Sequence, residues 1–252
     1  MAKTRRVLWV VGVGTLMAAV VMAQNGTSER KHQVDTITTK AGELKITFLG
    51  HGTLMFDCAG KVVHVDPWSR LADYAKLPKA SLVLITHEHG DHLDPKAVAA
   101  VRGEDTKVVL TKACADKVPD GLVMNNGDVK TVQDLKVEAV PAYNIVQQRD
   151  NGQPFHPKGA GNGYVVTFGE TRVYVAGDTE NTPEMKMLDK IDVAFLPMNL
   201  PYTMTPAMVA DAARAFKPRI LYPYHYGDTD PNELVNLLKD SKNIEVRIRN
   251  LK

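Results

Sequence analysis

Three of the eight histidines in this chain fall within six residues, at positions 87, 89 and 92, and Asp91 lies among them. Imidazole and carboxylate groups are the ligands that borderline divalent ions such as zinc take in proteins. Alternate side chains of an extended chain point to the same side, so His87 and His89 are expected to face one point. Gly90 lets the backbone turn, so that Asp91 and His92 can face a second point nearby. This spacing favours a metal site over a set of turn and capping residues.

The elements on either side of this motif predict where it lies. The continuous apolar run Ser81–Thr86 before it is typical of a strand that is buried on both faces. Asp94-Pro95 after it predicts a helix through Val101, because aspartate is a good N-cap and proline suits the first helical position. The motif is therefore expected in a loop at the end of a strand, where α/β proteins gather ligands.

The rest of the chain alternates groups of short strands with helices. Helices are predicted at 183–189, 205–216 and 231–239, since apolar residues recur there at helical spacing or follow a capping residue and a proline. Strands are predicted at 44–49, 53–57, 61–65, 107–110, 135–140, 163–168, 171–176, 191–196, 219–222 and 244–248. This order predicts one domain, residues 43–252, with two central sheets that are covered by helices on the outside.

The motif and several distant segments resemble the metallo-β-lactamase superfamily, whose metal motif is His-X-His-X-Asp-His. The segments around His51 and Asp66 resemble the opening hairpins of that family, Ala176-Gly177-Asp178-Thr179 resembles the strand end with its metal-bridging aspartate, and Pro223-Tyr224-His225-Tyr226-Gly227 resembles the strand end with its last histidine. The resemblance implies an α/β fold, the four-layer αββα sandwich, with the site at one edge of the two sheets. It is strongest to a branch of poorly characterised bacterial and archaeal metal-dependent hydrolases.

The resemblance also implies which residues bind metal. His87 and His89 would bind a first ion and Asp178 would bridge it to a second, which Asp91, His92 and His225 would bind. The predicted strands before Asp178 and His225 let both residues reach the same edge of the fold.

The chain departs from the family pattern at one ligand. Most members supply a third histidine to the first metal after a central strand, where this chain has Asn144. His156 is the nearest available histidine, and we predict that it completes the first site. The alternative is that His156 only lines the mouth of the pocket and that Asn144 or water completes a weaker site.

The chemistry that follows is hydrolysis. Two divalent ions, zinc first with Mn²⁺ or Fe²⁺ as alternatives, lower the pKa of a shared water and supply hydroxide at neutral pH. The expected substrate is a small molecule with an ester, lactone, phosphodiester or amide bond. The predicted catalytic residues are Asp91, which would orient the hydroxide, and Tyr202, which would donate to the developing oxyanion. Tyr224 and Tyr226 are less favoured donors, and packing is the alternative role for all three tyrosines.

Three rival functions stay open. β-Lactam cleavage is a special case of the same reaction, ranked below lactone, ester and phosphodiester cleavage. Diiron redox proteins of this fold carry glutamate where this chain has His89, and an all-nitrogen pair suits zinc better. A metal-binding protein without turnover is the third. The substrate itself depends on loops such as 143–162, whose shape the sequence does not reveal.

Several nearby residues have expected supporting or structural roles. Asp66 is expected to hydrogen-bond a ligand imidazole or its loop. His51 lies in a glycine-rich turn, and the sequence leaves open whether it supports the metal ligands. His64 is interpreted as a packed or surface histidine. Cys58 and Cys114 are interpreted as small buried residues, because two cysteines in a chain of this length form no disulfide framework.

The N-terminal residues predict export. A basic leader with Lys3, Arg5 and Arg6 precedes the apolar run Val7–Ala23, so residues 1–23 are expected to be a signal peptide cleaved after Ala23. A membrane anchor through residues 7–23 is the alternative. Residues 24–42 are polar and are interpreted as a tether or an irregular entry segment.

The charge balance argues against some partners. The chain has a net charge of +2, and without residues 1–23 it carries 28 Lys and Arg against 29 Asp and Glu. A nearly neutral body without a long basic run gives no reason to expect nucleic acid as a partner. No membrane contact is expected after cleavage, and the oligomeric state stays open.

Overall fold

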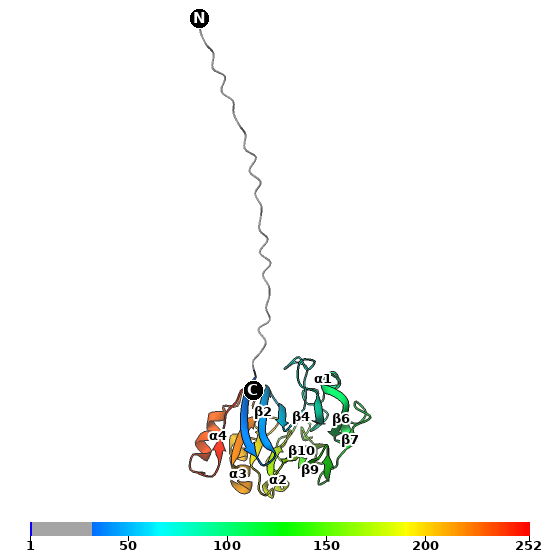
Figure 1. The fold of residues 1–252 in the computed structure, drawn as a ribbon. Coiled ribbons are helices and arrows are strands. Elements are labelled where there is room, and N and C mark those ends of the chain that lie inside the picture. The colour runs from blue at the N-terminus through cyan, green and yellow to red at the C-terminus, as the bar shows by residue number, and fades with distance from the viewer. Residues whose placement is uncertain (2–31) are drawn as a thin grey trace. The chain divides into compact units, whose positions relative to one another are not determined.

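Two seven-stranded sheets form the centre of the structure, and each takes its strands from one half of the chain (Figure 1). The computed structural model describes Met1 and residues 32–252. In spatial order the first sheet contains β1 (Gln33–Thr39), β2 (Gly42–Gly50), β3 (Thr53–Cys58), β4 (Lys61–Val65), β5 (Ala80–Leu84), β6 (Arg102–Leu110) and β7 (Leu122–Val123). The second contains β14 (Glu245–Val246), β13 (Ile220–Tyr224), β12 (Val193–Pro197), β11 (Thr171–Val175), β10 (Gly161–Phe168), β9 (Leu135–Ala142) and β8 (Val129–Val132).

The two sheets repeat one pairing pattern. In the first, β1 to β4 pair antiparallel and β4 to β7 pair parallel. In the second, β8 to β11 pair antiparallel and β11 to β14 pair parallel. The carboxyl ends of parallel strands meet at the same edge of a sheet, so the segments after β4, β5, β11 and β13 are brought close together.

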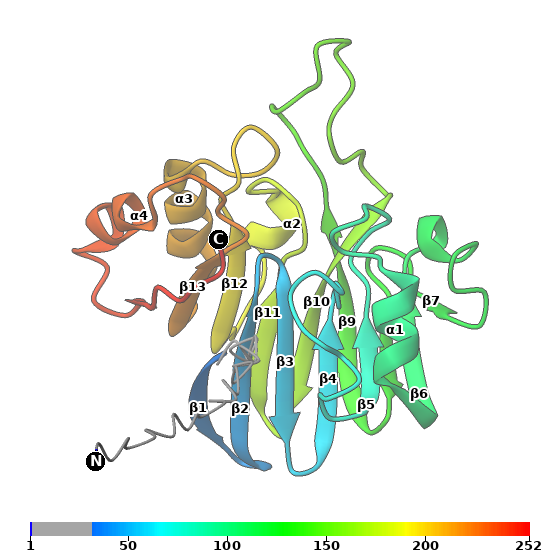
Figure 2. The same ribbon diagram turned by 90° about the horizontal axis from the view of Figure 1, so that it is seen from above.

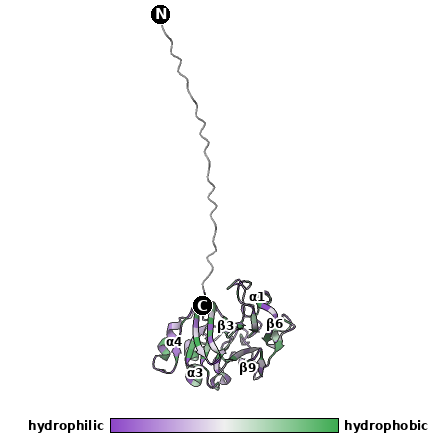
Figure 3. Ribbon diagram, viewed as in Figure 1, coloured by the Kyte–Doolittle hydropathy of each residue, from purple (hydrophilic) through white to green (hydrophobic). Residues whose placement is uncertain are grey.

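Alternating side chains divide the core into an inner and an outer layer. Leu82 and Leu84 of β5 belong to the core that joins the two sheets, whereas Val83 and Ile85 pack on the outside with α1 (Pro95–Val101). The helices α2 (Pro183–Lys186), α3 (Pro206–Phe216) and α4 (Pro231–Leu238) accompany the second sheet (Figure 2). Apolar and polar residues mix along α3 and α4, as expected of helices with one face on a sheet (Figure 3). The αββα prediction is confirmed.

The segment 24–42 was predicted to be a tether or an irregular entry segment; residues 24–31 lie outside the described residues, and the prediction is wrong for residues 33–39. Residues 33–39 form β1, which pairs with β2 at the edge of the first sheet. Of the seven β1 side chains, only that of Ile37 is buried, so the strand carries no apolar pattern that the sequence analysis could detect. Asp35 instead fixes the strand through the guanidinium group of Arg249 at 2.7 Å and the hydroxyl of Tyr222. The folded domain therefore includes residues that were placed outside it.

Apart from Met1, the export signal predicted at residues 1–23 lies outside the described residues. Within the described part, no helix is both long enough and apolar enough to cross a membrane.

Both cysteines and His64 are buried in the protein. Cys58 and Cys114 are free thiols in the inner and outer core, which confirms their interpretation as packed residues. His64 of β4 is fully buried, and its Nε2 donates to the carbonyl of Pro78 at 3.0 Å. Its Nδ1 has no hydrogen-bond partner, so the burial of this ring favours the neutral imidazole.

Candidate metal centre

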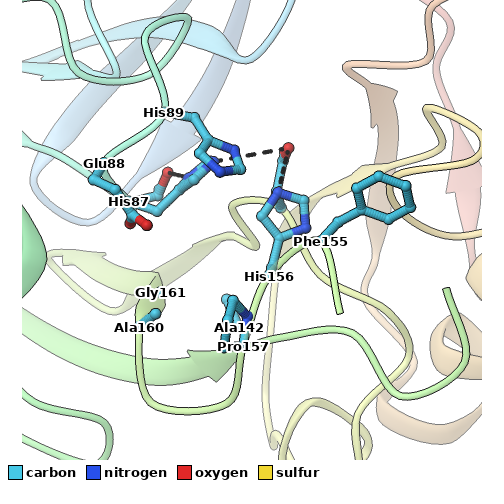
Figure 4. A pocket seen from close by; sticks show the side chains of 11 residues that line it. His87, Glu88, His89, Ala142, Phe155, His156, Pro157, Ala160 and Gly161 are labelled. Carbon is cyan, nitrogen blue, oxygen red and sulfur yellow. Dashed lines mark hydrogen bonds and ion pairs between the residues drawn. The ribbon is translucent and has the colours of Figure 1, made fainter. Parts of the chain in front are cut away.

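Eight histidine and aspartate side chains form two adjacent clusters at the edge where the parallel strands end. Within each cluster, the atoms that could bind a metal lie within 4.8 Å of one another. The first cluster, which we call cluster 1, contains His87, His89, His156 and Asp178; cluster 2 contains His51, Asp91, His92 and His225. All seven predicted metal ligands are among these residues, and His51 is the eighth. His87, His89 and His156 point toward one another across the gap between their loops (Figure 4).

Asp178 belongs to cluster 1 but also lies next to cluster 2. One of its carboxylate oxygens faces histidines of cluster 1, and the other faces histidines of cluster 2. Its Oδ2 is 3.3 Å from Nε2 of His156 and 3.9 Å from Nε2 of His87. Its Oδ1 is 3.5 Å from Nε2 of His92 and 3.6 Å from Nε2 of His225. Two ligands that share a tetrahedral zinc at about 2.0–2.1 Å lie roughly 3.3 Å apart. The carboxylate is therefore positioned as a bridge between two ions would be.

Buried atoms at this centre have no hydrogen-bond partner. They are Nε2 of His87 and His92, both ring nitrogens of His225 and Oδ1 of Asp178. A buried polar atom without a partner is costly, and proteins rarely leave several side by side. Cations between the clusters would satisfy the Nε2 atoms and the carboxylate oxygen at once, so the donor set fits divalent ions that take nitrogen and oxygen ligands.

Hydrogen bonds behind the rings fix two imidazoles of the motif. Nδ1 of His92 donates to Asp66 at 2.7 Å, and the backbone and hydroxyl groups of Thr86 donate to the same carboxylate. Because the Thr86 proton is used on Asp66, its oxygen accepts from Nδ1 of His87 at 3.0 Å. Both rings are thus held with Nε2 toward the centre. The role predicted for Asp66 is confirmed, whereas that of Thr86 was not predicted.

The structure places His156 in cluster 1 and Asn144 behind it. Oδ1 of Asn144 accepts from the backbone N–H of His156 at 2.7 Å and from its Nδ1 at 2.8 Å, which leaves Nε2 facing Asp178. The amide group of Asn144 donates in turn to the carbonyl of Tyr202 at 2.8 Å. Asn144 therefore replaces the expected third histidine in sequence but orients His156 in space.

The loop that carries His156 is anchored by a buried carboxylate that sequence reasoning missed. Glu180, two residues after Asp178, accepts from the backbone N–H groups of Ile145, Val146 and Gln147 at 2.9, 2.8 and 2.6 Å. The strand end that carries the central aspartate thus also fixes the start of the loop. The one available signal was a second acid close to Asp178 without a basic neighbour.

His51 closes cluster 2 from the hairpin between β2 and β3. Its Nε2 lies 3.0 Å from Oδ2 of Asp91, its ring is 3.7 Å from the ring of His225, and its carbonyl accepts from the His225 N–H. The next residue, Gly52, is required by close approach, because a Cβ atom there would lie 2.8 Å from Cε1 of His92. His51, whose role the sequence left open, thus contacts two predicted ligands.

The charges of the centre follow from burial and from neighbouring groups. Burial holds the pKa of His87 well below its ordinary value. Burial also lowers the pKa of His92, but the carboxylates of Asp178 and Asp66 outweigh it and raise that pKa to about 9. Burial raises the pKa of Asp178, but His225 and His92 outweigh it and hold the pKa well below its ordinary value. Asp178 is therefore ionised at neutral pH, and a metal ion that binds His92 must displace a proton.

A cavity of about 220 Å³ opens beside the clusters. Besides cluster residues, Arg149, Phe155, Asn199 and Tyr202 form its wall. Tyr202 is 44% exposed there. Tyr224 is buried in the core, and the Tyr226 hydroxyl donates to the carbonyl of Arg249. Of the three tyrosines that were considered as donors, only Tyr202 lines this cavity.

Comparison with known proteins agrees with this geometry. The sequence model of the β-lactamase superfamily domain matches residues 45–225. The chain belongs to the metallo-β-lactamase superfamily.

Relatives in this superfamily cover most of the chain. A metal-dependent hydrolase of Methanopyrus kandleri is 33% identical over 201 residues, which span 75% of this chain and 87% of that protein. A crystal structure named as a metal-dependent hydrolase of Parabacteroides distasonis is 53% identical with a TM-score of 0.84 and covers 88% of this chain and 100% of that one. Igni18, a metallo hydrolase of Ignicoccus hospitalis, is 26% identical with a TM-score of 0.69 and covers 82% and 95%.

Proposed function

We propose that this chain is a metal-dependent hydrolase whose two clusters each hold one divalent ion. The position of Asp178 is the main support for the proposal. Its two oxygens face histidines of different clusters, at distances expected between two ligands of one metal ion. The partnerless buried nitrogens around it support the same reading. Zinc is the preferred metal, since six of the eight side chains are imidazoles, and Mn²⁺ and Fe²⁺ are the alternatives.

The residues divide between the two ions. His87, His89 and His156 would hold one ion, and Asp91, His92 and His225 the other, with Asp178 shared. Two such ions, when bound, lower the pKa of a shared water toward neutrality and polarise the bond to be cleaved.

The chain's own groups would then position the water and the substrate. The Asp91 carboxylate is about one-third exposed, lines the cavity and is steadied by His51, so it can accept a hydrogen bond from the attacking water. The Tyr202 hydroxyl, on the cavity wall, can donate to an oxygen on which negative charge develops. The bond classes are ester, lactone, phosphodiester and amide, with β-lactams as a special case.

The rival functions are less well supported. The imidazole of His89 in cluster 1 favours zinc over an oxygen-activating diiron pair. The cavity beside the clusters gives a substrate access to them, which a protein that only stores metal would not need.

Metal analysis together with activity tests the proposal. We expect about two zinc equivalents per chain and turnover of at least one member of a panel of lactones, esters, phosphodiesters and β-lactams. His87→Ala and Asp178→Ala should lose zinc and most of the activity, whereas Asp189→Ala, an exposed acid in neither cluster, should retain both. Bound iron with oxygen consumption would contradict the proposal, as would unchanged zinc content in Asp178→Ala.

We also propose that the protein is exported to the periplasm or secreted. The basic leader and the apolar run at residues 7–23 support this. N-terminal sequencing of protein from the extracytoplasmic fraction should start at Gln24. A chain retained in the membrane with Lys3 still present would instead indicate an anchor.

A further inference from the structure

We propose that the substrate carries a negatively charged oxyanion, a carboxylate or phosphate, which Arg149 binds while Phe155 and Tyr202 contact the adjoining apolar part. This inference rests on the proposed function, because it takes the cavity beside the two clusters as the substrate site. It adds the chemical class of the substrate to the reaction proposed above.

Arg149 is held at the cavity by a small hairpin. The hairpin belongs to the loop between β9 and β10, and Gln148 and Pro154 pair at its base. The backbone of Arg149 donates to the carbonyl of Gln153 and accepts from the N–H of Gly152, both at 2.8 Å. Its side chain lines the same cavity as His89 and Asp91. The guanidinium group is thus placed by the fold beside the proposed metal centre.

The charge of Arg149 is not neutralised. Among the described residues, no carboxylate lies within ion-pair distance of its guanidinium group. Its one side-chain polar contact is Nη2 to the carbonyl of Phe155 at 3.5 Å, which is long for a hydrogen bond. Most of its five N–H donors are therefore free for a ligand, and the planar fork suits carboxylate or phosphate oxygens.

Arg149 is exposed to solvent, so water hydrates its charge, and what distinguishes it is its place on the wall of the cavity beside the clusters. Two divalent ions would outweigh the charges of Asp91 and Asp178 and leave the cavity positive. A further cation beside them would add to this positive potential, so an anion bound between Arg149 and the ions would be attracted by both. A substrate with its cleavable bond at the metal centre and an anionic group at Arg149 fits this arrangement.

The wall next to Arg149 is aromatic. The Arg149 guanidinium lies 5.0 Å from the ring centroid of Phe155, and that ring meets the ring of Tyr202 edge to face at 5.0 Å. The contact with Phe155 orients the guanidinium without using its donors. Both rings line the same cavity as Arg149 and the cluster residues, so the part of the substrate next to its anionic group should be apolar.

Calorimetric binding of simple acids tests the inference without turnover. Zinc-loaded protein would be titrated with α,ω-dicarboxylates from succinate to suberate and with monocarboxylates of equal chain length. Every acid has one carboxylate for the metals, but only a diacid has another for Arg149. We expect at least one diacid to bind about tenfold more tightly than its monoacid, because only the diacid can form a charge-assisted bidentate contact with Arg149. Replacing the second carboxylate by a phosphonate separates carboxylate from phosphate specificity.

Matched variants identify the residue responsible. Arg149→Gln should abolish the preference for diacids, and Arg149→Lys should retain part of it. Arg70→Gln is the control, because Arg70 is also exposed and lies over an aromatic ring, Trp68 at 5.4 Å, but does not line the cavity. Equal binding of diacids and monoacids at every length, or a preference that survives in Arg149→Gln, would overturn this inference alone. A protein that takes up no zinc would contradict the proposed function instead.

Discussion

The side-chain oxygen of Asn144 lies 2.8 Å from Nδ1 of His156 and 2.7 Å from the backbone nitrogen of the same residue. A partner of this kind fixes the tautomer and the orientation of a ligand ring, and its loss typically weakens metal binding about 10–100-fold. Asn144→Ala should therefore weaken the ion in cluster 1 by that factor and leave the ion in cluster 2 in place. Competition with a chromophoric zinc chelator resolves the two affinities.

Asn151→Ala is the matched control for this prediction. Asn151 lies in the same loop, but its side-chain oxygen accepts only from the N–H of Gln153. We expect the control to bind both ions as the wild type does. If Asn144→Ala weakened both ions equally, the orienting role assigned to Asn144 would be incorrect.

His51 is expected to act through Asp91. Its Nε2 is 3.0 Å from the Asp91 carboxylate, so His51→Ala should free that carboxylate and weaken the ion in cluster 2 about tenfold. His51→Gln should bind almost normally, because a glutamine amide can donate the same hydrogen bond. The absorption spectrum of cobalt-substituted protein reports the ligand set. A glutamine variant as weak as the alanine variant, with one nitrogen ligand lost, would show instead that His51 binds the ion directly.

Replacing Gly52 or Gly90, two glycines near the metal centre, by alanine should affect stability and zinc binding differently. A Cβ atom at Gly52 would lie 2.8 Å from Cε1 of His92 and 3.2 Å from Cδ2 of His225, so Gly52→Ala must displace at least one ring. We expect the unfolding free energy to fall by about 1–3 kcal/mol and cluster 2 to lose bound zinc. A Cβ atom at Gly90 would meet nothing within 4 Å, and Gly90→Ala should stay within about 0.5 kcal/mol of the wild type. Zinc content and urea unfolding measure both, and equal effects would contradict this difference.

The parts of the site that could be predicted from the sequence are those that local spacing determines. The segment from His87 to His92 follows a buried strand, and a strand end fixes where its next side chains lie. Asp178 and His225 follow strands of the same kind. His156 is the nearest available histidine to Asn144 in the sequence, which is why it could be predicted, and it lies in cluster 1.

The parts that escaped prediction depend on contacts between distant segments. The Glu180 carboxylate and the Asn144 side chain fix the loop from Tyr143 to Ala160 through hydrogen bonds. No local sequence pattern predicts either contact. The cavity wall at Arg149 is a consequence of that shape. Strand β1 was missed for a different reason, since an edge strand with one buried side chain has no apolar periodicity.

Glu180 should act as the anchor of the loop that carries His156. Glu180→Ala removes a buried acceptor from three backbone N–H groups, so we expect about 1–3 kcal/mol lower stability and a loosened loop. Trypsin should then cleave faster after Arg149. Glu184→Ala removes a partly exposed carboxylate that pairs with Lys158 and accepts from the Tyr143 hydroxyl, but no backbone N–H, so it should speed cleavage much less than Glu180→Ala does. Unchanged cleavage in both variants would show that the loop does not need this anchor.

His64 should make the fold sensitive to mild acid. Burial lowers the pKa of its imidazole from the ordinary 6.5 to about 4. Between these values the unfolded chain takes up a proton that the folded protein does not, so the unfolding free energy falls as the pH falls from about 6.5 to 4, by up to about 3 kcal/mol in total.

His64→Gln can keep the hydrogen bond to Pro78 but does not titrate. Urea unfolding of metal-free protein across this range should therefore give a variant that loses about 3 kcal/mol less than the wild type. The other histidines titrate in both proteins, so parallel stability curves would mean that the folded protein protonates His64 as readily as the unfolded chain does.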